Sequence, residues 1–169
     1  MNRAIAGLGV GLAVVVTACT TGRADISPEA RMLTAYAAWG EARSQARGWA
    51  PDAELQYVEG ASVTNRGTVL SDAGYWRFAY RADSRSQQYV VTVTPTSVDG
   101  EERTPQGPPG FAIGDATLGT DWIDSPQAVD ALDSFAEDTR IQMFLVPTNP
   151  PRWIAGDVEI DARSGAVLD

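Results

Sequence analysis

The sequence predicts an α+β fold in which helices pack on antiparallel strands, and three observations lead to this prediction. Apolar residues recur at helical steps in two short segments. Runs in which apolar and polar residues alternate follow each segment, a pattern typical of half-buried strands. A Gly- and Pro-rich stretch, residues 99–120, separates the two halves. The order fits either two related helix–strand units or one longer sheet that carries two helices.

The first unit is expected over residues 28–98. Ser27, Pro28 and Glu29 form a helix-start pattern, with Ser as the N-cap and Pro in the first turn. An apolar stripe follows at steps of three and four residues, with Met32, Leu33, Tyr36, Ala37 and Trp39 as its members. Strands are then expected at residues 55–63, 75–82 and 89–94, which are rich in aromatic, Val and Thr residues.

Residues 99–120 predict a long connection, partly mobile, because Gly and Pro recur there and neither regular structure can propagate. The second unit is expected over residues 121–169. Its helix begins at Ser125-Pro126, as the first begins at Ser27-Pro28, with Val129, Leu132 and Phe135 on one face. Strands are expected at residues 141–146, 153–161 and 166–168.

The N-terminus carries the strongest functional signal. Arg3 precedes an uncharged apolar stretch, residues 4–16, which is shorter than the roughly 18 residues of a membrane-spanning helix. The stretch ends in Val16-Thr17-Ala18-Cys19, which resembles the lipobox of bacterial lipoproteins. The alternative is an ordinary secretory signal followed by a buried cysteine, but the single Cys of the chain stands where a lipobox requires it.

The lipobox resemblance implies that residues 1–18 are a signal peptide and that residues 19–27 form a lipidated tether. Diacylglycerol on the Cys19 sulfur and an acyl chain such as palmitate on the new amine would anchor the protein to a membrane. The implied location is the cell envelope, outside the cytoplasm. Thr20, rather than Asp, follows the cysteine, which in a Gram-negative cell resembles outer-membrane sorting to the periplasmic side.

Charge and composition exclude several classes of function. The net charge is −9, and removal of residues 1–18 takes away Arg3 but no acid, so nucleic acid is not expected as a partner. The chain has no His and no Lys, which removes Ser–His–Asp, Cys–His and Ser–Lys nucleophile systems and the phosphate-binding P-loop. We therefore expect no enzyme activity, no cofactor and no metal. The alternative is an enzyme that uses an Asp or Tyr on a cone-shaped α+β scaffold.

Acidic residues gather in three places, each of which could be read as a cation or acid–base site. The simpler interpretations are a solvated helix face, the polar outer face of a strand, and helix capping by Asp124 or Ser125. No EF-hand spacing is present, and no spacing selects a catalytic carboxylate pair. The groups are Asp130, Asp133 and Glu137; Asp157, Glu159 and Asp161; and Asp121 with Asp124.

Residues 156–168, which read Gly-Asp-Val-Glu-Ile-Asp-Ala-Arg-Ser-Gly-Ala-Val-Leu, are similar to the closing hairpin of PepSY domains. The resemblance covers about residues 121–169 and, through the shared helix start, more weakly residues 28–98. It implies a cystatin-like shape with one helix packed on an antiparallel sheet. Such units occur in secreted and membrane-anchored bacterial proteins, and some have been proposed to restrain peptidases.

One cationic and aromatic patch is expected on the open face of the sheet. Tyr75, Arg77 and Arg81 alternate with the apolar side of their strand and are candidates for binding an acidic or peptide ligand. The alternative is an ordinary strand face whose arginines pair with neighbouring acids. Trp39 and Trp76 are expected in the core. The sequence thus predicts an anchored, non-catalytic binding or regulatory module for an envelope protein or peptide, or else a structural envelope component.

Overall fold

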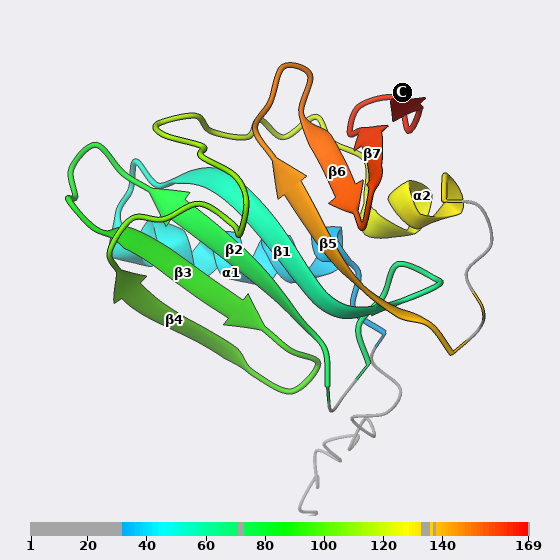
Figure 1. Cartoon of the computed structure of the whole chain (residues 1–169). Helices are drawn as coiled ribbons and strands as arrows, with labels where there is room; N and C mark the ends of the chain where they lie inside the picture. Colours follow the sequence, from blue (N-terminus) through cyan, green and yellow to red (C-terminus); the bar gives the residue numbers. More distant parts are fainter. Residues whose placement is uncertain (1–31, 71–72, 133–135, 137, 169) are drawn as a thin grey trace, which may run out of the picture.

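The computed structural model describes residues 32–70, 73–132, 136 and 138–168. Within these residues all eight strands belong to one antiparallel sheet, in the order β4-β3-β2-β1-β5-β6-β7-β8 (Figure 1). The long strand β1 (Glu54–Thr64) lies in the middle and pairs with β2 on one side and with β5 on the other. Of the two arrangements that the sequence left open, the strands therefore adopt the single sheet.

Helix α1 (Ala35–Trp49) and three strands form the first half of the chain. Thr34 is the N-cap of α1, and its side chain accepts a hydrogen bond from the Ala37 N–H group. Two successive hairpins then extend the sheet away from β1. Their strands are β2 (Tyr75–Arg81), β3 (Gln88–Val93) and β4 (Val98–Arg103).

The second half begins with the short helix α2 (Ser125–Asp130). Asp124 and Gln127 form a reciprocal capping box at its start, which confirms the predicted capping role of Asp124. The segment 153–161, predicted as one strand, instead turns at Gly156, whose φ of 61° suits glycine. The strands are β5 (Arg140–Val146), β6 (Arg152–Ala155), β7 (Val158–Asp161) and β8 (Val167–Leu168).

The predicted fold class, a cystatin-like α+β unit or two related helix–strand units, is wrong. One extended antiparallel sheet dominates the structure, α1 has 15 residues and α2 only six. The two halves do not close separately, because β5 pairs with the edge of β1 that a separate first unit would leave open. An open edge on an 11-residue strand would expose a row of unpaired N–H and C=O groups.

Strand β4 also extends the sheet into residues expected to form a connection. Its sequence, Val-Asp-Gly-Glu-Glu-Arg, lacks the apolar alternation that marks a half-buried strand. The strand forms because its backbone pairs with β3 over all six residues, and its charged side chains suit an edge strand exposed to solvent.

The start of α1 differs from the prediction as well. The predicted start at residues 27–29 lies outside the described residues. Leu33, predicted to be helical, forms an isolated antiparallel bridge with Val69, with backbone hydrogen bonds of 3.3 and 3.0 Å. Both backbone groups of Leu33 are committed to Val69, so the helix begins only at Ala35.

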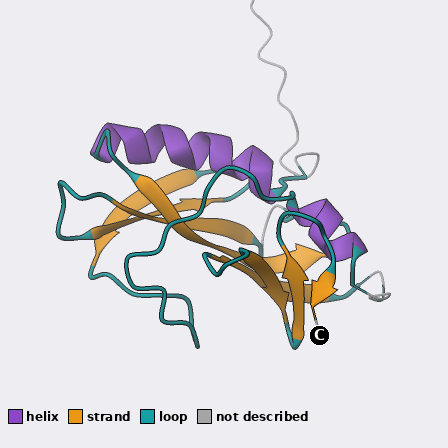
Figure 2. Ribbon diagram, turned by 90° about the horizontal axis from the view of Figure 1, so that it is seen from above, coloured by secondary structure: helices purple, strands orange, loops and turns teal. Residues whose placement is uncertain are grey.

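The main core lies between the sheet and the helices, which Figure 2 shows on one side of the sheet. Trp76 and Trp153 come from opposite halves of the sheet and are fully buried, with their ring centroids 6.2 Å apart. Each indole N–H group donates to a backbone carbonyl, that of Leu33 and that of Ile123 respectively. This shared core joins the two halves of the chain.

The opposite face of the sheet is partly covered by residues 104–115 of the predicted connection. Ile113 packs on a small buried cluster of Tyr57, Ala79 and Val90. Gln56 donates a 3.0 Å hydrogen bond to the carbonyl of Gly114. The segment therefore follows the sheet surface and does not leave this face fully open.

Candidate functional site

The predicted ligand-binding residues Tyr75, Arg77 and Arg81 alternate with the core-facing side chains of β2 and lie on its outer face. Arg77 donates to the buried carboxylate of Glu59 over 2.7 Å and lies over the Tyr75 ring at 4.6 Å. The Tyr75 hydroxyl and the Gln142 amide donate to the other Glu59 oxygen. The positive charge of Arg77 is therefore matched within the fold.

Arg81 is also paired. Its guanidinium donates to the Asp83 carboxylate over 2.6 Å and to the backbone carbonyl of Asp115 over 2.9 Å. The second contact attaches the covering segment to β2. Together with the Arg77–Glu59 pair, this arrangement gives the two arginines acidic partners from their own protein, so neither guanidinium is left without a counter-charge for a ligand.

Several residues of the predicted acidic groups have structural partners as well. Asp161 accepts hydrogen bonds from the backbone N–H groups of Ser164 and Arg163, which lower the pKa of its carboxyl below the usual value. Glu159 pairs with Arg152. Of the predicted helix-face group, Asp133 and Glu137 lie outside the described residues. Among the residues that are described, no three acids or cysteines come together in a way that could hold a metal ion.

A different site lies between α1, the sheet and the segment that follows residue 116, and we call it the Trp39 pocket. It is a cavity of about 130 Å³ that opens to solvent. Trp39 and Arg43 contribute side chains that only donate hydrogen bonds, whereas the Tyr and Thr hydroxyls of the lining can donate and accept and the Glu54 carboxylate only accepts. The lining residues are Trp39, Arg43, Ala53, Glu54, Leu55, Tyr80, Thr117, Leu118 and Thr120.

Local structure places the donors of the Trp39 pocket. Trp39 and Arg43 are four residues apart in α1 and so lie on the same face of the helix. The guanidinium carbon of Arg43 lies 5.1 Å from the centroid of the Trp39 ring, within cation–π range. Tyr80 projects from the core-facing side of β2 and is paired across the sheet with Leu55 of β1.

The third wall of the pocket comes from the end of the long connection. The Leu118 N–H group donates to the Leu55 carbonyl over 2.7 Å, which ties this segment to the start of β1. The Tyr36 hydroxyl donates to the Thr120 carbonyl over 2.9 Å, which ties it to α1. Three separate parts of the fold therefore hold the pocket walls in place.

Two buried polar atoms of the pocket lining lack hydrogen bonds. Trp39 is 8% exposed and Tyr80 is 2% exposed, and among the described residues neither the indole Nε1 nor the phenol Oη has a partner of acceptable geometry, although the indole lies near enough to the Tyr80 hydroxyl to lower its pKa. Burial raises the pKa of Tyr80 well above its usual value of 10.0, although the Trp39 indole and the Arg43 charge act in the opposite direction. Tyr80 is therefore a neutral hydroxyl at ordinary pH, with a proton to donate.

An aromatic cluster supports the pocket from behind. Trp39 contacts Tyr36 and Trp122 with ring centroids 5.3 and 5.5 Å away, and Trp122 contacts Trp153 at 6.0 Å. The cluster links α1 to both halves of the sheet through close aromatic packing. The Trp39 ring therefore has little room to turn its N–H group toward another partner.

The Trp39 pocket is not the largest cavity of the described residues. One cavity of about 390 Å³ lies beside Phe144. Another, of about 290 Å³, lies beside Met32, Leu70 and the exposed Arg66. The hydroxyls of Thr64 and Thr68, which also line it, already bond to each other over 3.0 Å. It therefore has no buried donor left unpaired, whereas the smaller Trp39 pocket has two.

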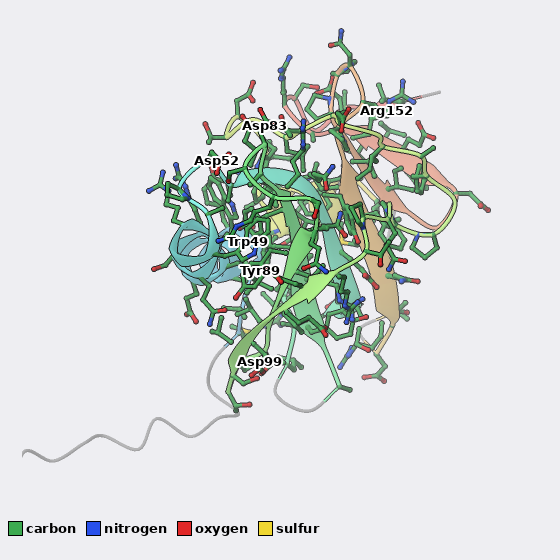
Figure 3. The ribbon with its side chains drawn as sticks, turned by 90° about the vertical axis from the view of Figure 1, so that its left-hand side faces the viewer. Trp49, Asp52, Asp83, Tyr89, Asp99 and Arg152 are labelled. Carbon is green, nitrogen blue, oxygen red and sulfur yellow. The ribbon has the colours of Figure 1, made fainter. Side chains whose placement is uncertain are left out.

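Aromatic residues also meet at the far end of α1. Figure 3 shows Trp49 beside Tyr89, and their rings stack with centroids 5.2 Å apart. The Trp49 indole N–H group donates to Glu102 over 2.5 Å, and the Arg85 guanidinium lies over the Trp49 ring. The Trp49 indole and the Arg85 guanidinium, which donates to the Trp49 carbonyl, are both partnered, so this cluster joins α1 to β3 and β4.

Sequence analysis placed Trp39 in the core, which its burial confirms, but it did not single out Arg43 or Tyr80 as functional residues. The spacing of Trp39 and Arg43 was the one available signal, because residues four apart on a helix can form a cation–π pair. Tyr80 carried no such signal, since its alternation with polar residues predicts only that it faces the core.

No family model, curated protein or solved structure matches this chain. Neither helix in the part of the chain that the structure describes is long and apolar enough to cross a bilayer. Cys19 and the rest of the predicted signal peptide and tether lie outside the described residues. The proposal for its function therefore rests on the local geometry of the described residues.

Proposed function

We propose that this protein is a lipoprotein anchored to the cell envelope through Cys19, and that its body is a non-catalytic module that binds a protein or peptide partner. The anchor rests on the lipobox-like sequence that ends at Cys19. The binding role rests on one observation, the solvent-open Trp39 pocket, whose lining includes two side chains with buried donors, Trp39 Nε1 and Tyr80 Oη, that have no acceptor among the described residues. Buried polar groups in folded proteins normally have partners, and a group supplied from outside would explain this exception beside an open cavity.

The size of the pocket supports a macromolecular partner. Sites for small molecules and cofactors usually enclose roughly 300–1,000 Å³. At about 130 Å³, the Trp39 pocket is too small for such a ligand but large enough for the end of a side chain or of a polypeptide chain. A partner could insert one polar group there while the surrounding surface contacts the rest of it.

Acid–base properties favour binding over the alternative of a carboxylate- or Tyr-based enzyme. A catalytic carboxylic acid needs a raised pKa and a catalytic Tyr a lowered one. Hydrogen bonds from Ser84 lower the pKa of Asp52, and those from residues 163 and 164 lower that of Asp161. Burial raises the pKa of Tyr80. Each of these shifts is opposite to what catalysis by that group would require.

The anchor is tested by Cys19→Ser. Wild-type protein should fractionate with membranes and incorporate a palmitate analogue during metabolic labelling, whereas the Cys19→Ser protein should do neither. A Thr20→Ser variant is the matched control, because it changes a neighbouring hydroxyl residue without removing the thiol. Labelling of the Cys19→Ser protein would refute the lipoprotein assignment.

The binding role is tested by capture from envelope extract with detergent-solubilised full-length protein. We expect a protein or peptide that the wild type retains and that an Arg43→Gln variant retains poorly. Arg47→Gln, one helical turn further along α1 and outside the pocket lining, makes the same charge change and should behave as wild type. Equal retention by all three proteins, or no specific retention at all, would contradict a binding role for the pocket.

A further inference from the structure

We infer that the Trp39 pocket recognises a carboxylate group of its partner, which receives hydrogen bonds from Trp39 Nε1 and Tyr80 Oη and faces the guanidinium of Arg43. The inference rests on the proposed binding function and names the chemistry of the group that is bound. The carboxylate could be a chain terminus or an Asp or Glu side chain of the partner, because both present the same two oxygens.

The two buried polar atoms of the pocket lining that lack partners can both donate a hydrogen bond. An indole nitrogen can only donate, an arginine can only donate, and a phenol can donate one proton while it accepts another. If the Trp39 N–H group turned to donate to Tyr80, the Tyr80 proton would still lack an acceptor. The nearby Leu55 carbonyl already accepts from Leu118. The carboxylate and hydroxyl groups elsewhere in the lining do not bond to these two buried donors, and an ionised carboxylate from a partner would supply two acceptor oxygens.

Charge in the pocket points the same way. Arg43 is half-buried, and among the described residues no carboxylate lies within ion-pair distance of it, unlike Arg77 and Arg81 on the other face. Its charge acts on the Tyr80 hydroxyl, and its guanidinium contacts the face of the Trp39 ring. That contact leaves the edge of the guanidinium, where its N–H groups point, available to an anion.

Glu54 limits which anion can bind. Its exposed carboxylate also lines the pocket and would repel a ligand of high negative charge. One guanidinium with one nearby carboxylate suits a monoanion better than a phosphate dianion, which is typically held by clusters of arginines.

Indole N–H signals offer a direct test, since the chain has five tryptophans. Full-length protein labelled with ¹⁵N and held in detergent micelles would be titrated with sodium acetate at constant ionic strength. Titrations would follow with acetyl-Gly-Ala-Gly bearing a free C-terminus, with its C-terminal amide, and with acetyl-Gly-Glu-Gly-amide. The Trp39 signal is assigned by its loss in Trp39→Phe. The Trp49 signal serves as the internal reference, because that indole already donates to Glu102.

Acetate and at least one carboxylate-bearing peptide should shift the Trp39 signal in a saturable way, while the Trp49 signal stays in place. The free-terminus peptide and the Glu peptide distinguish a terminal from a side-chain source. Arg43→Gln and Tyr80→Phe should each weaken binding about tenfold to a hundredfold, the usual loss for a hydrogen bond to a charged group. Arg47→Gln should leave binding unchanged, and Glu54→Gln should strengthen it by removing a repulsive charge.

Two results would overturn the carboxylate assignment. One is a Trp39 signal that does not move with acetate or with either carboxylate peptide. The other is an equal shift with the amidated peptide, which would mean that the pocket binds a neutral group and would leave the proposed binding function intact. Failure of the envelope capture, by contrast, would remove the proposed function itself, so the two failures can be told apart.

Discussion

Replacement of Gly60 by Ala tests the central position of β1, on which the single-sheet architecture depends. Gly60 lies opposite Trp76 of β2 and opposite Met143 of β5, so it stands between the two halves of the sheet. A methyl group on Gly60 would lie 2.3 Å from Cζ3 of Trp76 and 2.7 Å from Cγ2 of Val63. Carbon atoms in contact are normally about 3.5–4.0 Å apart. One of these groups must therefore move by about 1 Å.

Little in the neighbourhood can move by that much. Trp76 is fully buried, its Nε1 donates to the Leu33 carbonyl over 2.9 Å, and its ring packs against Trp153. Overpacking a well-filled core typically costs about 1–3 kcal/mol, and we expect Gly60→Ala to fall near the upper end. For a protein of this size, a loss of about 3 kcal/mol lowers Tm by about 6–12 °C.

Urea denaturation followed by tryptophan fluorescence would measure the change, with an unaltered m-value as evidence that the unfolded state is unaffected. Gly40→Ala is the matched control. Gly40 lies inside α1, and an added methyl group there meets no atom within 4 Å. Because Ala is favoured over Gly in helices by about 1 kcal/mol, this control should be more stable than wild type. A Gly60→Ala protein as stable as wild type would refute the packing of Trp76 against a central β1.

Two further predictions concern the connection and Tyr80. Limited proteolysis should cut first within residues 104–117, and the two fragments should stay associated because β1 pairs with β5. Separation of the fragments in size-exclusion chromatography, or a first cut within β4, would contradict this prediction. Because the pKa of Tyr80 is raised in the folded state, above about pH 10 the unfolded state loses a proton that the folded state keeps. The free energy of unfolding should therefore fall as pH rises beyond that point and be unaffected by Tyr80 below it. Tyr80→Phe should reduce this alkaline fall without abolishing it, because burial also raises the pKa values of Tyr57 and Tyr75. An identical fall of Tm between pH 9 and 11 in wild type and variant would show that Tyr80 does not titrate in this way.

Much of the local structure could be predicted from local sequence patterns. The alternation of Trp76, Phe78 and Tyr80 with polar residues predicted both the strand and its buried side. The Ser-Pro segment after Asp124 predicted the start of α2. These predictions succeed because side-chain alternation and helix capping depend on neighbours within a few residues of the chain.

The predictions that failed concern pairing between distant segments. Leu33 has the spacing of a helical stripe, yet it bonds to Val69. Residues 98–103 have no strand pattern, yet they pair with β3. The helix-on-sheet fold class failed for the same reason, since nothing local in β1 or β5 indicates that these strands are neighbours. Backbone hydrogen bonding is available to nearly every residue type, so side-chain patterns alone do not specify the partner strand.

The sequence by itself determined which chemical groups this protein has. It is an acidic chain without His or Lys, with a lipobox-like segment that ends at Cys19 and with tryptophans on apolar faces. Only the tertiary structure decided which charges remain available. It pairs Arg77 with Glu59 and, among the described residues, leaves Arg43 without a carboxylate partner beside two buried donors. Those three donors come from α1 and β2, and β1 and the end of the long connection complete the walls around them. The arrangement arises when these distant segments pack together, and no local pattern in the chain encodes it.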